Sequence, residues 1–288
     1  MKADKNRMYA DIDFLTSLQP ARHYLNTESL GKATDYISDQ LIKAGLQPER
    51  QTWSFSTRQY SNIVAKYKRG EKKRMVIGAH YDVAGDQPGA DDNASGIAGL
   101  LETARLISAE NSVTGFGIDF VAYCLEEPPF FGTINMGSYI HARSLNESKT
   151  NVMGMIGYEM IGYFSDERNS QSFPDPRLKL KYPSTGNFIM VVGIEEHCDF
   201  NKKVHRLMKK DSEIDVRMIS FPSPDSLAGM SDQRNYWKFG YKAVMINDTA
   251  EFRNKNYHCE SDTIDTLDFT RMAQVVDGVC NAVRYERG

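Results

Sequence analysis

The sequence predicts an α/β protein with a mixed, mostly parallel central sheet and helices on both of its faces. Strand-like runs alternate with helical segments along the chain, and most of these runs are continuously apolar. Continuous apolar runs are typical of parallel strands that are buried on both faces. No repeat, low-complexity tract or linker divides the 288 residues, so we expect one domain, 1–288, with a helical segment at about 9–48 packed on its core.

The helix-like segments have apolar residues on one stripe. Residues 27–45 show this pattern most clearly and stop at Gly45, a common helix terminator. Further helices are expected at 94–107, 134–143, 200–210 and 268–285.

The strand-like runs are short and bounded by turn residues. The basic segment 69–74 predicts a hairpin turn, and residues 164–187 and 219–231 predict loops. Strands are expected at 51–56, 62–67, 75–79, 118–125, 152–158, 188–192 and 243–248.

Composition excludes several classes of function. A hydrophobic content of 41% and a charged content of 25% are typical of globular proteins. The net charge of −3 gives no reason to expect a nucleic-acid or anionic-membrane partner, and no apolar run reaches the length of a membrane span. The four cysteines form no C-x-x-C pair, which argues against a disulfide framework or a thiolate zinc site. The polar N-terminus has no signal-peptide core, yet a removed leader would leave the same sequence, so an exported and a cytoplasmic location both stay open.

The stretch 75–96 contains a candidate metal site. An apolar strand leads into His80 and Asp82, and after a Pro/Gly turn Asp91 and Asp92 precede a helix. Imidazole nitrogen and carboxylate oxygen both suit zinc, and Asp82 lies on the same face of an extended chain as His80, where it could orient the ring. The simpler alternative is a capped strand end with an ordinary helix N-cap at Asp91 or Asp92.

Four more candidates lie just past the ends of expected strands or in the connection beyond: Glu126, Glu127, Glu159 and His258. In open α/β sheets, ligands bind beyond the carboxyl ends of the strands. Two adjacent glutamates at the end of a buried strand are costly unless a ligand or hydrogen bonds compensate their charge. Taken singly, Glu126 and Glu127 also fit a solvated turn, Glu159 fits a carboxylate at the start of a helix, and His258 fits a histidine in a loop.

Five motifs, in this order along residues 62–269, resemble those of the di-zinc aminopeptidase family, which includes bacterial leucine aminopeptidases and animal glutaminyl cyclases. The motifs are His80-Tyr81-Asp82, Gly89-Ala90-Asp91-Asp92-Asn93-Ala94-Ser95-Gly96, Glu126-Glu127, Glu159-Met160-Ile161-Gly162-Tyr163, and Asn256-Tyr257-His258 followed by Ser261-Asp262-Thr263.

The resemblance implies two zinc ions and a role for each matching residue. Asp91 would bridge both ions, and Asp92 would follow a cis peptide bond. Glu126 would be the general base, Asp82 would orient His80, and Tyr257 would hydrogen-bond the oxyanion. The remaining ligands would be His80 and Glu159 at one zinc and Glu127 and His258 at the other.

The resemblance therefore implies an aminopeptidase that acts on peptides with a free N-terminus. Two departures from the family pattern are Glu159, where many members have Asp, and Gln233, where many have His. The alternatives are a glutaminyl cyclase-like enzyme with a single zinc and a peptidase-like binding module without metals. The loops 164–187 and 211–230 are expected to shape the substrate pocket, whereas the preferred side chain and the oligomeric state stay open.

Overall fold

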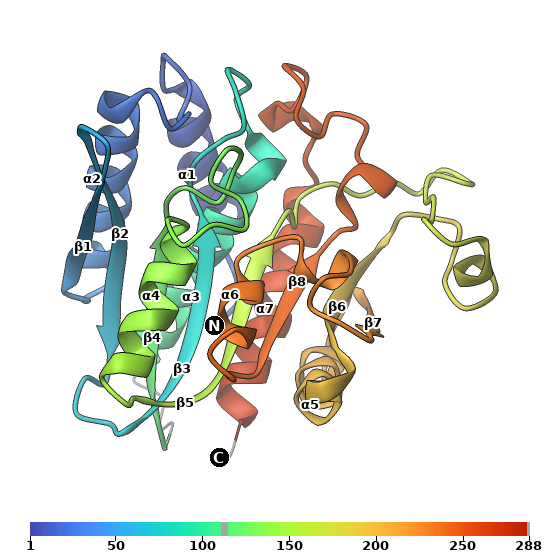
Figure 1. The fold of residues 1–288 in the computed structure, drawn as a ribbon. Coiled ribbons are helices and arrows are strands. Elements are labelled where there is room, and N and C mark those ends of the chain that lie inside the picture. The colour runs from blue at the N-terminus through green and yellow to red at the C-terminus, as the bar shows by residue number, and fades with distance from the viewer. Residues whose placement is uncertain (111–114, 287–288) are drawn as a thin grey trace.

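The computed structural model describes residues 1–110 and 115–286, and an eight-stranded sheet forms its centre (Figure 1). The strands lie in the order β1-β2-β4-β3-β5-β8-β6-β7. Their bounds are β1 Pro48–Phe55, β2 Arg58–Tyr67, β3 Lys73–His80, β4 Gly117–Tyr123, β5 Asn151–Glu159, β6 Phe188–Ile194, β7 Asp215–Phe221 and β8 Ala243–Asn247. The helices are α1 Lys5–Ser17, α2 Thr27–Lys43, α3 Gly96–Ala109, α4 Gly137–Glu147, α5 Cys198–Lys209, α6 Gln233–Trp237 and α7 Phe269–Tyr285.

The sheet is parallel at its centre and mixed toward its edges. Strands β4, β3, β5 and β8 run parallel to one another, β2 is antiparallel to β4, and β6 is antiparallel to β8. The predicted fold class is therefore confirmed. The predicted hairpin at 69–74 is wrong, because β4 lies between the antiparallel strands β2 and β3, so these two strands do not pair with each other.

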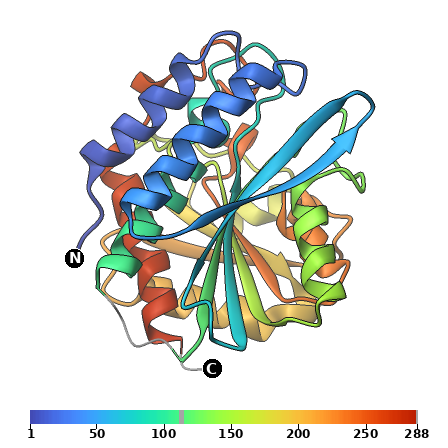
Figure 2. The ribbon, with the colours of Figure 1, turned by 90° about the vertical axis from the view of Figure 1, so that its left-hand side faces the viewer.

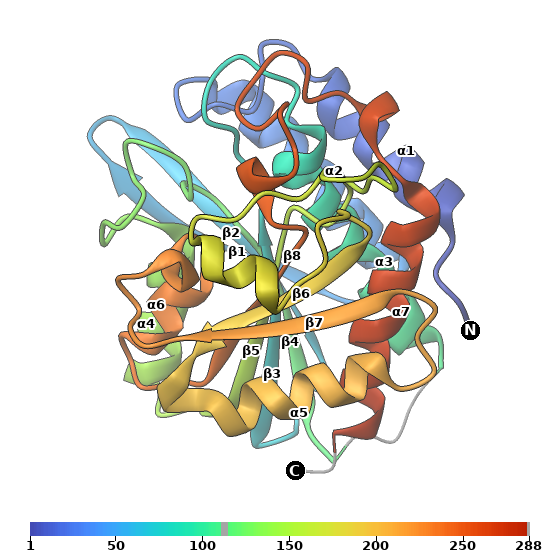
Figure 3. The ribbon, with the colours of Figure 1, turned by 90° about the vertical axis from the view of Figure 1, so that its right-hand side faces the viewer.

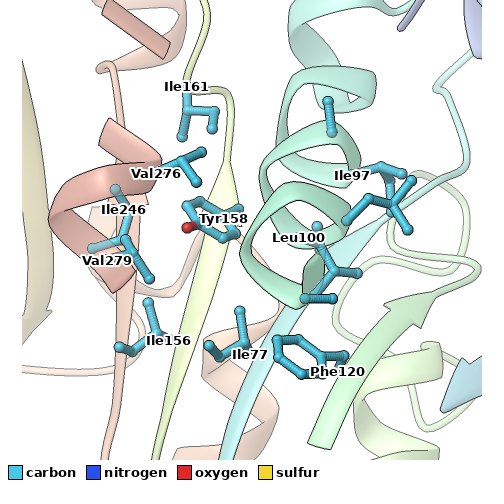
Figure 4. Packing of buried hydrophobic residues seen from close by; sticks show 14 of the residues in the cluster. Ile77, Ile97, Leu100, Phe120, Ile156, Tyr158, Ile161, Ile246, Val276 and Val279 are labelled. Carbon is cyan, nitrogen blue, oxygen red and sulfur yellow. The ribbon is translucent and has the colours of Figure 1, made fainter. Parts of the chain in front are cut away.

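Helices cover the two faces of the sheet unequally. Helices α1, α2, α3, α5 and α7 pack on one face, and α4 and α6 pack on the other (Figures 1 and 2). In the larger core, Ile77 and Tyr158 of the central strands meet Leu100 of α3 and Val276 of α7 (Figure 4). No helix in the described ranges is both long and apolar enough to cross a membrane.

An irregular segment, residues 160–187, lies over β6 and β7 on the α6 side of the sheet. It contains the 3₁₀ helix Pro176–Leu180, drawn in yellow in Figure 3. Edge strand β7 occupies part of the stretch predicted to be loop. Its polar residues and half-buried side chains give it neither a continuous apolar run nor a clear alternation, so the sequence pattern did not reveal it.

Candidate metal centre

The parallel strands bring the predicted site residues to one edge of the sheet. Strand β3 ends at His80 and β5 ends at Glu159, while Glu126 and Glu127 follow the end of β4. His258 comes from the loop after β8. Three groups of side chains could each hold a metal ion, with ligand atoms within 4.8 Å of one another: His80 with Glu126 and Glu127, His80 with Asp92 and Glu159, and Asp92 with Glu127 and His258.

The carboxylate of Asp92 lies between the two histidines. Its Oδ1 is 3.4 Å from Nε2 of His80, and its Oδ2 is 3.0 Å from Nε2 of His258. On the first side, Nε2 of His80 is also 3.2 Å from Oε2 of Glu159. On the second side, Nε2 of His258 is 3.4 Å from Oε2 of Glu127. The geometry is that of two adjacent three-ligand groups that share Asp92.

Asp91, predicted to bridge the two ions, points away from this centre. Its Oδ1 accepts a hydrogen bond from the backbone N–H of Gly162 and its Oδ2 one from Nδ2 of Asn254, both at 2.8 Å. The carboxylate that lies between the two histidines is that of Asp92, so the structure does not place Asp91 where the prediction puts it. The cis bond is likewise displaced by one residue, because it joins Asp92 to Asn93 rather than preceding Asp92.

A buried carboxylate fixes the backbone that separates the two aspartates. The two oxygens of Asp262 accept the N–H groups of Asp91 at 2.9 Å and of Asp92 at 3.1 Å. With the backbone held by these two hydrogen bonds, the side chain of Asp91 points to the buried turn at Gly162 and that of Asp92 points to the two histidines. Asp262 lay within the matched motifs, but no role was predicted for it.

Asp82 contacts His80 and also positions the two glutamates. Nδ1 of His80 is 3.2 Å from the backbone oxygen of Asp82 and 3.6 Å from its Oδ1. The two carboxylate oxygens accept the backbone N–H groups of Glu126 and Glu127, each at 3.1 Å. Asp82 therefore links the end of β3 to the turn after β4, a role that the sequence did not suggest.

The centre carries buried polar atoms with no hydrogen-bond partner in the described part of the chain. They are Nε2 of His80, Oδ1 of Asp92, Oε1 of Glu126 and Oε1 of Glu127. Carboxylates buried without partners are costly, and bound cations would compensate them. The donor set of imidazole nitrogens and carboxylate oxygens suits zinc, so the residues present fit the implied metal.

The pKa values of the site side chains follow from burial and crowding. Burial, together with the nearby Asp92 charge, raises the pKa of Glu127 to about 8. Burial also raises the pKa of Glu126 well above its ordinary value. Burial alone would lower the pKa of His258, but its hydrogen bonds to Asp92 and Glu127 raise it to about 10. In the metal-free protein the histidine proton thus offsets part of the negative charge that two divalent cations would neutralise.

Three further side chains, those of Tyr257, Ser231 and Gln233, have contacts that bear on the centre or on the predictions. The ring of Tyr257 stacks on that of His258, with centroids 3.9 Å apart and an interplanar angle of 23°. Ser231 donates a hydrogen bond to Oε2 of Glu159 at 2.5 Å. Gln233 is fully buried and donates to the backbone oxygen of Ala228 at 2.6 Å. Gln233 belongs to none of the three candidate metal groups.

Arg22 supports the loop between His80 and Asp91, although nothing in the sequence marked it. The guanidinium is fully buried and donates to the backbone oxygens of Tyr81 at 2.8 Å and of Pro88 and Gly89 at 3.0 Å. Burial lowers the pKa of Arg22 to about 10, which still leaves it charged at neutral pH.

Replacing Arg22 by Leu is expected to destabilise the protein by at least about 3 kcal/mol, since each buried acceptor left without a donor costs about 1–3 kcal/mol. Urea unfolding measures this change. Arg143→Leu, which removes an exposed ion pair with Glu147, is the matched control and should cost less than about 0.5 kcal/mol. Equal, small losses in both variants would contradict the role given to Arg22.

A mostly apolar pocket adjoins the centre at Glu159 and Tyr257. Its walls come from β6, β7, β8, the loop after β8 and residues 171–182. Part of each predicted loop, 164–187 and 211–230, therefore contributes to the wall of a pocket beside the metal centre. We call this space the apolar pocket.

Comparison with known proteins shows the sequence family to which the chain belongs. The sequence pattern of peptidase family M28 matches residues 62–283. YfbL of Escherichia coli (strain K12), described as uncharacterized, is 39% identical over 285 residues, which are 96% of this chain and 87% of YfbL. The probable lipoprotein aminopeptidase LpqL of Mycobacterium tuberculosis is 28% identical, and the alignment covers 81% of this chain and 46% of LpqL.

Two solved structures from Bacteroides thetaiotaomicron match over nearly their full length. A leucine aminopeptidase precursor has a TM-score of 0.76 at 21% identity, covering 100% of this chain and 99% of its own. A glutaminyl cyclase has a TM-score of 0.76 at 22% identity, with the same coverage. At these identities the likeness shows the fold alone, which is the zinc exopeptidase-like α/β fold.

Proposed function

Because the chain belongs to peptidase family M28, we propose that it is a zinc-dependent aminopeptidase that removes N-terminal residues from peptides. The observation that carries this proposal is the position of Asp92, whose two oxygens face one histidine each. A carboxylate in that position is suited to bridge two cations. Relatives described as aminopeptidases, including a probable leucine aminopeptidase 1 of Trichophyton verrucosum at 26% identity, support the same activity.

The proposed ligands are His80, Asp92 and Glu159 for one zinc ion and Asp92, Glu127 and His258 for the other. Bound zinc would polarise the peptide carbonyl group and make a water molecule more acidic. Glu126 is the proposed general base. Within the described residues its Oε1 has no hydrogen-bond partner, and its Oε2 is 3.9 Å from Nε2 of His80, farther than the nearest oxygens of Asp92 and Glu159.

Each remaining side chain has a defined task in this proposal. Glu126 takes a proton from the attacking water and passes it to the departing amine. Asp82 holds the backbone of Glu126 and the ring of His80 in place. Tyr257, which is fixed by stacking on His258, donates a hydrogen bond to the oxygen that becomes negatively charged.

The first test combines metal content with cleavage of free-amine aminoacyl p-nitroanilides. Protein purified without chelator is expected to hold close to two zinc ions and to release p-nitroaniline. Removing the metal with a chelator should abolish release, and adding zinc should restore it. Zinc-loaded protein that cleaves no member of a broad panel would overturn the proposal.

A glutaminyl cyclase is the second candidate, because a cyclase structure matches this chain over its full length. Such an enzyme would need one zinc ion, on Asp92, Glu127 and His258. The pairing of His80 with Glu159 at 3.2 Å provides ligands for a second ion and favours the aminopeptidase. One zinc equivalent, no p-nitroaniline release and cyclisation of a peptide with N-terminal Gln would reverse this preference.

A further inference from the structure

The floor of the apolar pocket is one face of the sheet. Phe188, Met190 and Val192 alternate along β6, so their side chains project from the same face. Ile219 of β7 and Met245 of β8 lie beside them and complete this floor. A substrate side chain that entered the pocket would lie against aliphatic, aromatic and thioether groups.

The cover of the apolar pocket is the irregular segment that lies over β6 and β7. Phe173, Leu178 and Tyr182 line the pocket from this side. The hydroxyl of Tyr182 donates to the backbone oxygen of Met218 at 2.8 Å, which ties the cover to β7. Leu180, on the same 3₁₀ helix as Leu178, is 92% exposed and does not line the pocket.

Three polar side chains in the pocket wall, those of Gln171, Ser172 and Asn247, are already hydrogen-bonded within the protein. Nε2 of Gln171 donates to Oγ1 of Thr249 at 2.9 Å. Nδ2 of Asn247 donates to the backbone oxygen of Glu159 at 2.7 Å, and the hydroxyl of Ser172 donates to the backbone oxygen of Phe252 at 2.6 Å. A polar or charged substrate side chain would lose its water without gaining these partners, which is unfavourable.

The register of the strands gives the depth of the apolar pocket. Glu159, at its entrance, pairs with Asn247, and Asn247 pairs with Met190. Val192 pairs with Met245 two residues farther from the edge of the sheet, which is about 7 Å along the strands. A long unbranched or aromatic side chain would cover more of this floor than an alanine side chain, which would leave most of it uncovered.

We propose that the enzyme selects peptides with N-terminal Met or Phe, and that Val192 and Met245 limit the length of the side chain it accepts. This inference rests on the proposed aminopeptidase function. The flexible thioethers of Met190 and Met245 suit this choice, because methionine adapts its shape and makes favourable contacts with aromatic rings.

The first experiment compares kcat/KM for the p-nitroanilides of Met, Phe, Leu, Ala, Lys and Asp with zinc-loaded wild-type protein. The kcat/KM values of the Met and Phe substrates are expected to exceed that of the Ala substrate by about 100-fold. The value for Leu should lie between those two and Ala, and the values for Lys and Asp should fall below that for Ala. Chelator-sensitive cleavage with Ala, Lys or Asp as the best substrate would overturn this inference and leave the aminopeptidase proposal standing.

The second experiment changes the pocket. Val192→Phe fills the deep end and is expected to lower the ratio of kcat/KM for the Met and Phe substrates to kcat/KM for the Ala substrate about 10-fold or more. Leu178→Ala removes a pocket contact and should weaken selection for Phe over Ala, whereas Leu180→Ala should leave it unchanged. If Val192→Phe fails to fold, the pair of leucine variants decides. Equal selectivity in Leu178→Ala and Leu180→Ala would contradict the proposed pocket.

A binding measurement separates this inference from the function on which it rests. Zinc-loaded Glu126→Gln protein is titrated with methionine amide and alanine amide in a calorimeter. Tighter binding of methionine amide, by about 10-fold or more, supports the apolar pocket even if the wild-type protein cleaves no substrate. Equal affinities would count against the pocket as a specificity site, whatever the activity of the wild-type protein.

Discussion

Replacing Glu126 by Gln is expected to lower kcat/KM about 100- to 10,000-fold while zinc content stays at the wild-type level. The two side chains have nearly the same shape, but the amide cannot accept the proton of the attacking water. The backbone of residue 126 would keep its hydrogen bond to Asp82, so the turn that carries Glu127 should stay in place. Steady-state kinetics and elemental analysis of the same preparation measure both quantities.

Glu147→Gln is the matched control for this substitution. Glu147 is exposed, lies at the end of α4 and pairs only with Arg143 in the described part of the chain. It should therefore change neither activity nor metal content. Near-normal activity of the Glu126→Gln variant with full zinc content would exclude Glu126 as the general base.

The sequence predicted the central part of the fold because those strands are buried on both faces. The runs that became β3, β5 and β8 are continuously apolar, the run that became β4 is apolar apart from Asp119, and the stripe on residues 27–45 became α2. The edge strand β7 carries no such signal, since it is only half buried. The sequence pattern also does not determine the order of the strands, and a hairpin at 69–74 is therefore predicted where β4 in fact separates β2 from β3.

Most of the candidate site could be predicted from the sequence, because its residues lie at the ends of predicted strands. His80, Glu126, Glu127 and Glu159 follow consecutive parallel strands, so their convergence followed from the fold class. The sequence could not separate Asp91 from Asp92. Two adjacent carboxylates have the same chemistry, and only the tertiary contacts decide which of them faces the histidines.

The supporting contacts come from parts of the chain that are distant in sequence. Arg22 and Asp262 hold the two sides of the loop that carries Asp91 and Asp92. Arg22 lies in a segment without any motif, and Asp262 lies in a matched motif whose pattern does not show what its carboxylate contacts. The apolar pocket likewise combines three strands with an irregular segment. Local periodicity carries no information about such pairings.

The pair Asp92→Ala and Asp91→Ala tests the correction at the bridging position. Asp92→Ala is expected to reduce zinc content from two ions to less than one, because both three-ligand groups lose the carboxylate that they share. Activity should fall with the metal. Zinc content after dialysis against metal-free buffer, measured with kcat/KM, checks this result.

Asp91→Ala should show the opposite pattern. It leaves the backbone N–H of Gly162 and the side-chain amide of Asn254 without an acceptor. Each buried donor that loses its acceptor lowers the free energy of unfolding by about 1–3 kcal/mol. The folded protein should nevertheless still bind two zinc ions, since Asp92 remains between His80 and His258. Loss of zinc in Asp91→Ala together with retention in Asp92→Ala would restore Asp91 as the bridging ligand. Two variants one residue apart thus separate a carboxylate that supports the fold from one that binds metal.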